Sequence, residues 1–281
     1  MIFNQILSRK HKVLPIPLLM SALAKKVEIP IQQNVWTAKE QTYQNDLKLA
    51  ADFQQTVLPE IVEVDYLDIA LTYKPYDLVS GDVYDFMLNR EKELAIFIGD
   101  ATGHGISAAL MTMMVHIAID SLTPNLATDK SIRKLNQLIS SRNTGRSVTS
   151  VLFRIRPDGL MNITHAGHPS LIVVPNDNSE LVSFKEAGCP LGLFIDEPVK
   201  YIEETYQLKS GDKIIAYTDG LTEWRNELKE AYGLDRLLET IKNNRSFDCN
   251  NLVQAIYNDA ELFSNHQLNS DDLTILISEY K

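Results

Sequence analysis

The stretch Ile96-Phe97-Ile98-Gly99-Asp100-Ala101-Thr102-Gly103-His104-Gly105 carries an apolar strand into a carboxylate and then into a glycine-rich turn. The residues that follow, 106–111, begin an apolar pattern with helical spacing. This order predicts that Asp100 lies at the rim of a sheet, beside backbone groups that can meet a ligand. A single Asp at a strand end commonly caps a turn, so the stretch alone does not predict a function.

Acidic residues beside strands recur along the chain. Four such positions, each next to a glycine or to a second Asp, are Asp82, Asp100, Asp219 and Asp271. Strands that lie side by side would bring these carboxylates together, where they would repel one another unless a cation were bound. Oxygen ligands suit hard divalent cations such as Mg²⁺ and Mn²⁺. The pattern therefore predicts a metal site.

Composition limits the classes of protein that fit. The chain has 281 residues, 44% hydrophobic and 23% charged, which suits one large or two small globular domains. A net charge of -10 argues against a nucleic-acid-binding surface, since no basic field would attract phosphates. Cys189 and Cys249 show no metal-ligand spacing and indicate two free thiols in a reducing compartment, so we expect a cytoplasmic protein.

The N-terminus has a basic cluster at residues 8–12 followed by an apolar run at 13–24. This order superficially resembles a signal peptide. The run begins late, contains two prolines and is followed at once by Lys25-Lys26, which favours a packing or docking segment in the cytoplasm. It is also shorter than the roughly 20 apolar residues of a membrane span, so we expect no transmembrane segment.

We expect three parts: an N-terminal appendage at 1–38, a linker helix at 39–60 and one domain at 61–281. The helical pattern from Lys39 to Val57 ends before Pro59. An ordinary amphipathic helix that packs on the core is one interpretation, which the spacing favours. The other is a helix that transmits a signal or forms a homodimer.

Short turns join most of the strands, which predicts mostly antiparallel sheets. The expected strands are 68–73, 82–88, 93–99, 151–156, 160–164, 171–174, 181–184, 200–208, 213–218 and 273–277. The expected helices of the domain are 105–120, 131–141, 234–242 and 251–263. The first three strands read as a meander, and 200–208 and 213–218 as a hairpin. The class is α+β: two sheets packed face to face with helices outside.

The helix at 105–120 shows one apolar face, which we expect to pack on the sheet. This face consists of Ile106, Ala109, Leu110, Met113 and Ile117.

Motifs spread over residues 46–281 resemble, in order, those of the PPM-type metal-dependent serine/threonine phosphatases, in the SpoIIE/RsbU branch. They are Val79-Ser80-Gly81-Asp82-Val83-Tyr84-Asp85, Gly99-Asp100-Ala101-Thr102-Gly103-His104-Gly105-Ile106-Ser107-Ala108-Ala109-Leu110, Ala166-Gly167-His168-Pro169, Pro190-Leu191-Gly192, Gly211-Asp212, Tyr217-Thr218-Asp219-Gly220-Leu221-Thr222-Glu223, Tyr232-Gly233 and Asp271-Asp272-Leu273-Thr274. The resemblance implies a four-layer αββα sandwich, in agreement with the layers expected above.

The resemblance also implies two bound ions, Mn²⁺ or Mg²⁺. Carried over by position, Asp82 would bridge both ions with the Val83 carbonyl as a neighbouring ligand. Asp100 would lie at the second ion, while Asp219 and Asp271 would complete the first. These four aspartates are also the expected catalytic residues, because they would hold the cations that activate the attacking water.

Other residues receive weaker expectations. Asp272 is the less favoured alternative to Asp271 as a ligand, and Asp85 would support the site without binding metal. His104 could act as a general acid, although a histidine between two glycines is more often structural. His165, where family members often carry Asn, and His168 would shape a turn. Candidates to hold the phosphate are Arg142, Arg146 and Arg225, each with a solvated surface role as the alternative.

The resemblance implies a protein phosphatase that hydrolyses phosphoserine or phosphothreonine with a metal-activated water. Its substrate would be a phosphorylated regulatory protein in a partner-switching pathway, such as an anti-sigma-factor antagonist. A metal-dependent phosphodiesterase or nuclease is disfavoured by the net charge of -10. A catalytically weak, partner-binding signalling module of the same fold is the other alternative, and the complete acidic set speaks against it.

Overall fold

The computed structural model describes residues 39–281 except 143–144, 186 and 195–198. The chain divides into two units, Met1–Leu49 and Ala50–Lys281. A helix occupies residues 39–57, which confirms the helix expected there. The expected appendage at 1–38 lies outside the described residues, and the proposed boundaries after residues 38 and 60 stay predictions. No helix in the described part is long and apolar enough to cross a membrane.

Two five-stranded sheets form the centre of the larger unit. Sheet A has the order β1 (Leu67–Lys74), β10 (Leu273–Tyr280), β9 (Lys213–Tyr217), β6 (Leu171–Val174) and β7 (Val182–Phe184). Sheet B has the order β2 (Asp82–Leu88), β3 (Leu94–Ala101), β4 (Val148–Ile155), β5 (Leu160–Ala166) and β8 (Glu203–Gln207). Each neighbouring pair of these strands is antiparallel.

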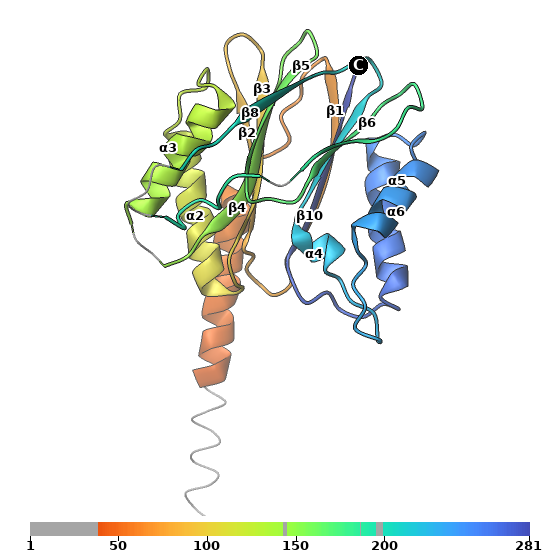
Figure 1. Cartoon of the computed structure of the whole chain (residues 1–281). Helices are drawn as coiled ribbons and strands as arrows, with labels where there is room; N and C mark the ends of the chain where they lie inside the picture. Colours follow the sequence, from red (N-terminus) through yellow and green to blue (C-terminus); the bar gives the residue numbers. More distant parts are fainter. Residues whose placement is uncertain (1–38, 143–144, 186, 195–198) are drawn as a thin grey trace, which may run out of the picture. The chain divides into compact units, whose positions relative to one another are not determined.

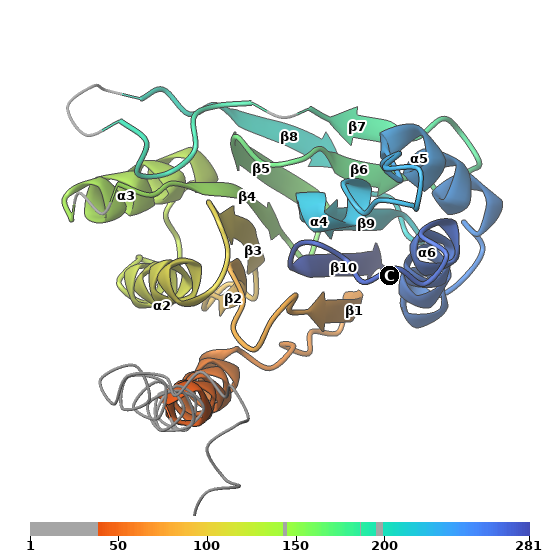
Figure 2. The same cartoon turned by 90° about the horizontal axis from the view of Figure 1, so that it is seen from below.

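Helices cover the outer faces of both sheets (Figures 1 and 2). On sheet B lie α2 (Ile106–Asp120) and α3 (Thr128–Ser140). On the side of sheet A lie α5 (Leu234–Asn243) and α6 (Cys249–Phe263), while the short α4 (Asp219–Thr222) contacts β10. The four layers confirm the expected α+β sandwich of the αββα type.

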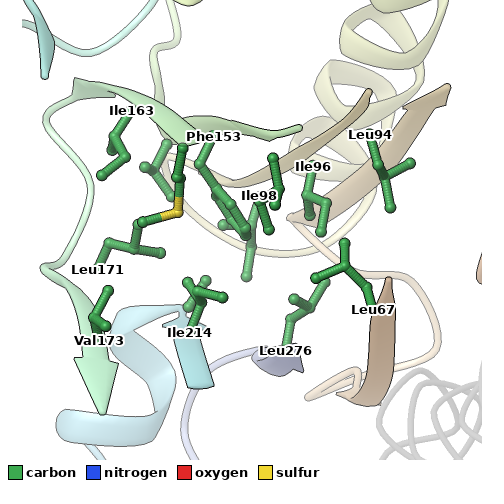
Figure 3. Packing of buried hydrophobic residues seen from close by; sticks show 14 of the residues in the cluster. Leu67, Leu94, Ile96, Ile98, Phe153, Ile163, Leu171, Val173, Ile214 and Leu276 are labelled. Carbon is green, nitrogen blue, oxygen red and sulfur yellow. The ribbon is translucent and has the colours of Figure 1, made fainter. Parts of the chain in front are cut away.

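Strand alternation explains the layers, because successive side chains point to opposite faces of a sheet. In β3, Ile96 and Ile98 enter the core between the sheets, whereas Phe97 packs towards α2 and α3. In β9, Ile214 enters the same central core and Ile215 packs towards α5 and α6. Figure 3 shows the central core, where residues of both sheets meet.

Two expected strand pairings are wrong. The first strand does not join a meander: β1 pairs with β10 in sheet A, while β2 and β3 form a hairpin in sheet B. Likewise β8 pairs with β5 and β9 with β10, so the expected hairpin between them is absent. Both turns that were read as hairpin connections instead carry the chain from one sheet to the other.

The expected buried face of α2 is also mostly wrong, although one of its residues, Ala109, is buried. Ile106, Leu110 and Ile117 are 42%, 66% and 72% exposed. The helix instead packs through a face that includes Ala108 and Val115, both fully buried. Gly81 lies close against this face, because a Cβ built on it would lie 3.0 Å from the Ala108 Cβ. Apolar residues surround most of this helix, so periodicity alone could not identify the packed side.

The turn between β8 and β9 is fixed by a buried carboxylate. Asp212 is 1% exposed and accepts hydrogen bonds from the amides of Lys209 and Asn176, both at 2.9 Å. We predict that Asp212→Ala lowers the free energy of unfolding by about 2 kcal/mol, because two charge-assisted hydrogen bonds are lost. Urea unfolding measures this change. Asp177→Ala, an exposed carboxylate in the adjacent loop, is the matched control and should have a much smaller effect.

Candidate metal-dependent active site

The β1–β2 connection and the end of β3 bring the first two expected residues together. Asp82 opens β2 and pairs with Asp100 near the end of β3 in the antiparallel register. Asp82 is 1% exposed, and its backbone amide donates to the Ser80 hydroxyl at 3.1 Å. Side chains at directly opposed positions share one face of a sheet, so these two carboxylates are neighbours.

Two threonines hold the Asp82 carboxylate of sheet B: Thr274 of β10 in sheet A, and Thr218, which directly follows β9 of the same sheet. The Thr218 and Thr274 hydroxyls donate to Asp82 Oδ2 at 2.8 and 2.6 Å. Thr218 is the residue before Asp219, and the Thr274 amide donates to the Thr218 hydroxyl at 2.9 Å. Neither threonine was expected to contact the site from the sequence, although Thr218 and Thr274 stand in the same motifs as Asp219 and Asp271.

Close backbone approach brings the other two expected residues into the same cluster. Asp219 is the first residue of α4, and Gly220 packs so tightly against the residue that follows Asp271 that a Cβ there would lie 1.9 Å from the Asp272 carbonyl oxygen. Glycine is therefore required at this position, since no side chain fits. The structure thus gathers Asp82, Asp100, Asp219 and Asp271 from three separate regions of the chain.

Asp272 has a different contact set from Asp271. It is 2% exposed, and its two carboxylate oxygens accept hydrogen bonds from the backbone amides of Tyr76 and Gly81, at 2.8 and 2.7 Å. Asp272 therefore anchors the β1–β2 connection to the start of β10. The adjacent Asp271 accepts only a local hydrogen bond, from the Asp272 amide at 2.9 Å, among those seen in the structure.

The crowded carboxylates hold protons tightly. Burial raises the pKa of Asp82 well above its usual value, with further increases from the charges of Asp272 and Asp219. Burial, followed by the charges of Asp82 and Asp219, raises the pKa of Asp100 to about 9. Burial and the charge of Asp271 raise the pKa of Asp219 to about 6. A divalent cation would relieve this repulsion, and carboxylate oxygens are suitable ligands for a hard ion.

The case for a metal at this cluster rests on the charge and the oxygen donors of its carboxylates. Among the described residues, no group of three or more His, Cys, Asp or Glu side chains is arranged to hold an ion as it stands. The charge repulsion and the oxygen donors nevertheless match what Mg²⁺ or Mn²⁺ would need. The assignment of Asp82, Val83, Asp100, Asp219 and Asp271 as ligands therefore stays a prediction.

Asp85 and the histidines make contacts outside the carboxylate cluster, and Asp85 faces α2 on the opposite side of sheet B from Asp82. The Asp85 carboxylate contacts His116 of α2, with Oδ2 and Nδ1 2.9 Å apart, which ties α2 to β2. The His104 ring packs edge-on against Tyr76, with 6.3 Å between centroids. Burial lowers the pKa of His165 to about 4 and that of His168 to about 3, so both are neutral at pH 7.

Of the three candidate arginines, one contacts the turn after Asp100. The Arg146 guanidinium donates to the Thr102 carbonyl oxygen. Arg225 instead donates to the Lys229 carbonyl oxygen at 2.9 Å, within its own turn. No recorded contact links Arg142 to the cluster among the described residues.

The helix at 39–57 makes one further contact that was not predicted from the sequence. Gln54 is 5% exposed and bonds to Ser80 twice: its Nε2 donates to the Ser80 carbonyl at 2.8 Å, and its Oε1 accepts from the Ser80 amide at 2.9 Å. The same Nε2 donates to the Thr112 hydroxyl of α2 at 3.0 Å. Gln54 thus connects the helix to the residues that lead into Asp82.

Comparison with known proteins identifies the family. The model of Stage II sporulation protein E (SpoIIE) matches residues 90–281, more than half of the chain. The chain belongs to the SpoIIE family. This confirms the PPM-type resemblance in its SpoIIE/RsbU branch.

Two relatives of this SpoIIE-family chain come from Bacillus subtilis (strain 168). Phosphoserine phosphatase RsbU is 28% identical over 250 residues, which cover 86% of this chain and 72% of RsbU. Phosphoserine phosphatase RsbP is 25% identical over 183 residues, which cover 63% of this chain and 45% of RsbP. The chain thus spans most of RsbU but less than half of RsbP.

Solved structures agree with the fold. The SiaA-PP2C domain of Pseudomonas aeruginosa superposes with a TM-score of 0.76 at 22% identity, covering 87% of this chain and 98% of that one. The PP2C phosphatase domain of SpoIIE from Bacillus subtilis, with a fragment of its regulatory domain, gives a TM-score of 0.65 at 20% identity, covering 78% and 64%. The SpoIIE-family chain therefore has the PP2C fold.

The raised pKa of Asp100 predicts a pH-dependent stability of the metal-free protein. Between pH 3.8, the ordinary pKa of Asp, and about 9, the folded state keeps a proton that the unfolded state has released. The free energy of unfolding therefore falls as the pH rises through this range. Thermal unfolding in EDTA at a series of pH values measures the slope, which should be shallower in Asp100→Asn. An equal slope in both proteins would contradict the crowding described above.

Proposed function

We propose that this chain is a metal-dependent protein serine/threonine phosphatase that hydrolyses phosphoserine or phosphothreonine on a signalling regulator. The observation that carries the proposal is the cluster of mutually repelling carboxylates, gathered at one end of a PP2C fold in a SpoIIE-family chain. Such a cluster costs stability unless it binds cations, and phosphoryl transfer needs cations to balance the phosphate charge.

Four aspartates would hold two ions, either Mn²⁺ or Mg²⁺: Asp82 between them with the Val83 carbonyl beside it, Asp100 at the second, and Asp219 with Asp271 at the first. When bound, such ions lower the pKa of water and polarise the phosphoryl group. The protein itself orients the carboxylates. Thr218 and Thr274 fix Asp82, and Asp272 fixes the connection that leads into it.

Relatives support the choice of substrate class. RsbU and RsbP are named phosphoserine phosphatases, and a solved neighbour contains RsbU and RsbW domains in one protein of Mycobacterium tuberculosis. RsbX, of the same fold, was solved in complex with magnesium. We propose a phosphorylated partner-switching regulator as substrate, such as an anti-sigma-factor antagonist. Two free cysteines support a cytoplasmic location.

The competing function is a catalytically weak module of the same fold that only binds its partner. Loss of one or more acidic residues from the cluster would favour that alternative. Asp82, Asp100, Asp219 and Asp271 are all retained in this chain, which supports an active enzyme.

Replacing single aspartates tests the enzymatic proposal. Asp82→Asn or Asp219→Asn should lower kcat/KM on a phosphoserine peptide at saturating Mn²⁺ by about a hundredfold or more, because each would remove a charged ligand. Asp158→Asn, at the exposed β4–β5 turn, is the matched control and should keep full activity. Circular dichroism checks that each variant is folded. Near-normal turnover in either site variant, or activity that a chelator does not affect, would contradict the proposal.

We also propose that residues 1–60 control activity and contribute to a homodimer, with Gln54 as the contact closest to Asp82 along this route. Deleting residues 1–45 should change the turnover rate or the mass measured by light scattering. The same rate and the same mass in both proteins would remove the support for this role. Gln54 itself remains in the shortened protein, so its contacts with Ser80 are not what is tested.

A further inference from the structure

A groove beside the acidic cluster has no role in the chemistry described so far. It has a volume of about 220 Å³ and is lined by Tyr76, Trp224, Tyr257, Leu268, Leu273 and Asp271, among others. Asp271 is one of the proposed metal ligands, so the groove opens directly beside the cluster. A molecule whose phosphate reached the cluster would have its neighbouring atoms at this groove.

The groove carries an exposed leucine on a fixed loop. Leu268 is 92% exposed. The residues on both sides of it are held: Trp224 Nε1 donates to the Gln267 carbonyl at 3.0 Å, and Asn269 Nδ2 donates to the Gly220 carbonyl at 3.0 Å. These two contacts hold the backbone of the loop on both sides of Leu268. A lone exposed leucine is ordinary on a protein surface, whereas one held at the edge of a groove offers a ready apolar contact.

Aromatic rings form the walls of the groove. Trp224 and Tyr257 pack with ring centroids 5.8 Å apart, and the ammonium group of Lys74 lies 6.0 Å from the Tyr257 centroid. On the side of the cluster, Tyr76 is 49% exposed, although its amide is held by Asp272. Charged groups at Lys74 and Glu261 also line the groove, but apolar atoms make up most of its surface, so the groove suits an apolar side chain better than a charged one.

We propose that this groove is the subsite that binds an apolar side chain adjacent to the phosphoserine or phosphothreonine of the protein substrate. The proposal rests on the phosphatase function proposed above. The size of the groove favours this occupant, because about 220 Å³ is below the roughly 300–1,000 Å³ of typical small-molecule sites but sufficient for one large side chain. Its continuity with Asp271 favours a group attached to the reacting residue over a separate ligand.

Two kinds of substrate distinguish binding in the groove from hydrolysis of the phosphate. p-Nitrophenyl phosphate has no flanking residue and reports the reaction alone. Phosphoserine peptides that carry leucine or aspartate at each position flanking the phosphoserine report the groove. The full chain with Mn²⁺ should prefer a leucine peptide over its aspartate counterpart by roughly tenfold in kcat/KM, the scale set by burying one leucine side chain.

The variant Leu268→Glu should lose this preference, mainly through a higher KM for the leucine peptide, and should hydrolyse p-nitrophenyl phosphate at the wild-type rate. Leu88→Glu is the matched control. Leu88 is 44% exposed and ends β2, whereas Asp82 begins this strand, so the variant should change neither reaction. Leu268→Ala should fall between wild type and Leu268→Glu, because it shortens the contact without adding a charge.

The outcomes are distinct for the groove and for the enzyme. An unchanged leucine preference in Leu268→Glu, with normal hydrolysis of p-nitrophenyl phosphate, would overturn the groove proposal and leave the phosphatase proposal standing. The absence of a leucine preference in the wild type would likewise overturn the groove proposal and leave the phosphatase proposal standing. No hydrolysis of any substrate by the wild type would instead overturn the proposed function.

Discussion

One carboxylate oxygen joins the two sheets of this domain at the acidic cluster. Asp82 lies on β2 in sheet B, and the hydroxyls that bind its Oδ2 come from Thr274 of sheet A and from Thr218, which follows β9 of that sheet. Since the pKa of Asp82 is raised by burial and by its acidic neighbours, these hydrogen bonds stabilise a charge that the interior would otherwise reject. This junction also places two other acidic residues, because Asp100 pairs with Asp82 and Asp219 follows Thr218.

The connection from β1 to β2 is held from two independent directions. Asp272 binds the amides of Tyr76 and Gly81, while Gln54 binds both backbone groups of Ser80. A loop between two sheets would normally be among the more mobile parts of a domain. Here its polar backbone groups are paired with side chains from the helix at 39–57 and from the start of β10. Displacement of Asp272 or Gln54 would therefore shift Asp82, the residue that follows this loop.

Local patterns in the sequence predicted most of the elements, although not α4, and named the four acidic residues that lie together in the structure. Alternation along 82–88 gave the bounds of β2, and the glycine beside each aspartate marked the places of close backbone approach. The same patterns could not predict which strands pair. The partners of β1 and β8 are β10 and β5, which lie far away along the chain. In addition, the sequence of a turn between two strands looks the same whether the turn closes a hairpin or crosses between sheets. The hydrogen bonds of Gln54 were invisible for a similar reason, since a polar residue on an amphipathic helix normally faces solvent.

The pairing of β1 with β10 has a consequence for folding of the chain during its synthesis. These strands are the first and the last of the domain, and the contact of Tyr76 with Asp272 spans 196 positions of the chain. On a ribosome, sheet B can pair most of its strands early, but the central core stays open on one side until β10 emerges. Contacts so distant in sequence also slow folding, because the entropy cost of closing a long loop comes before the contacts can stabilise the chain. A nascent chain therefore exposes apolar residues of β1 for most of its synthesis, and these residues are open to aggregation until β10 covers them.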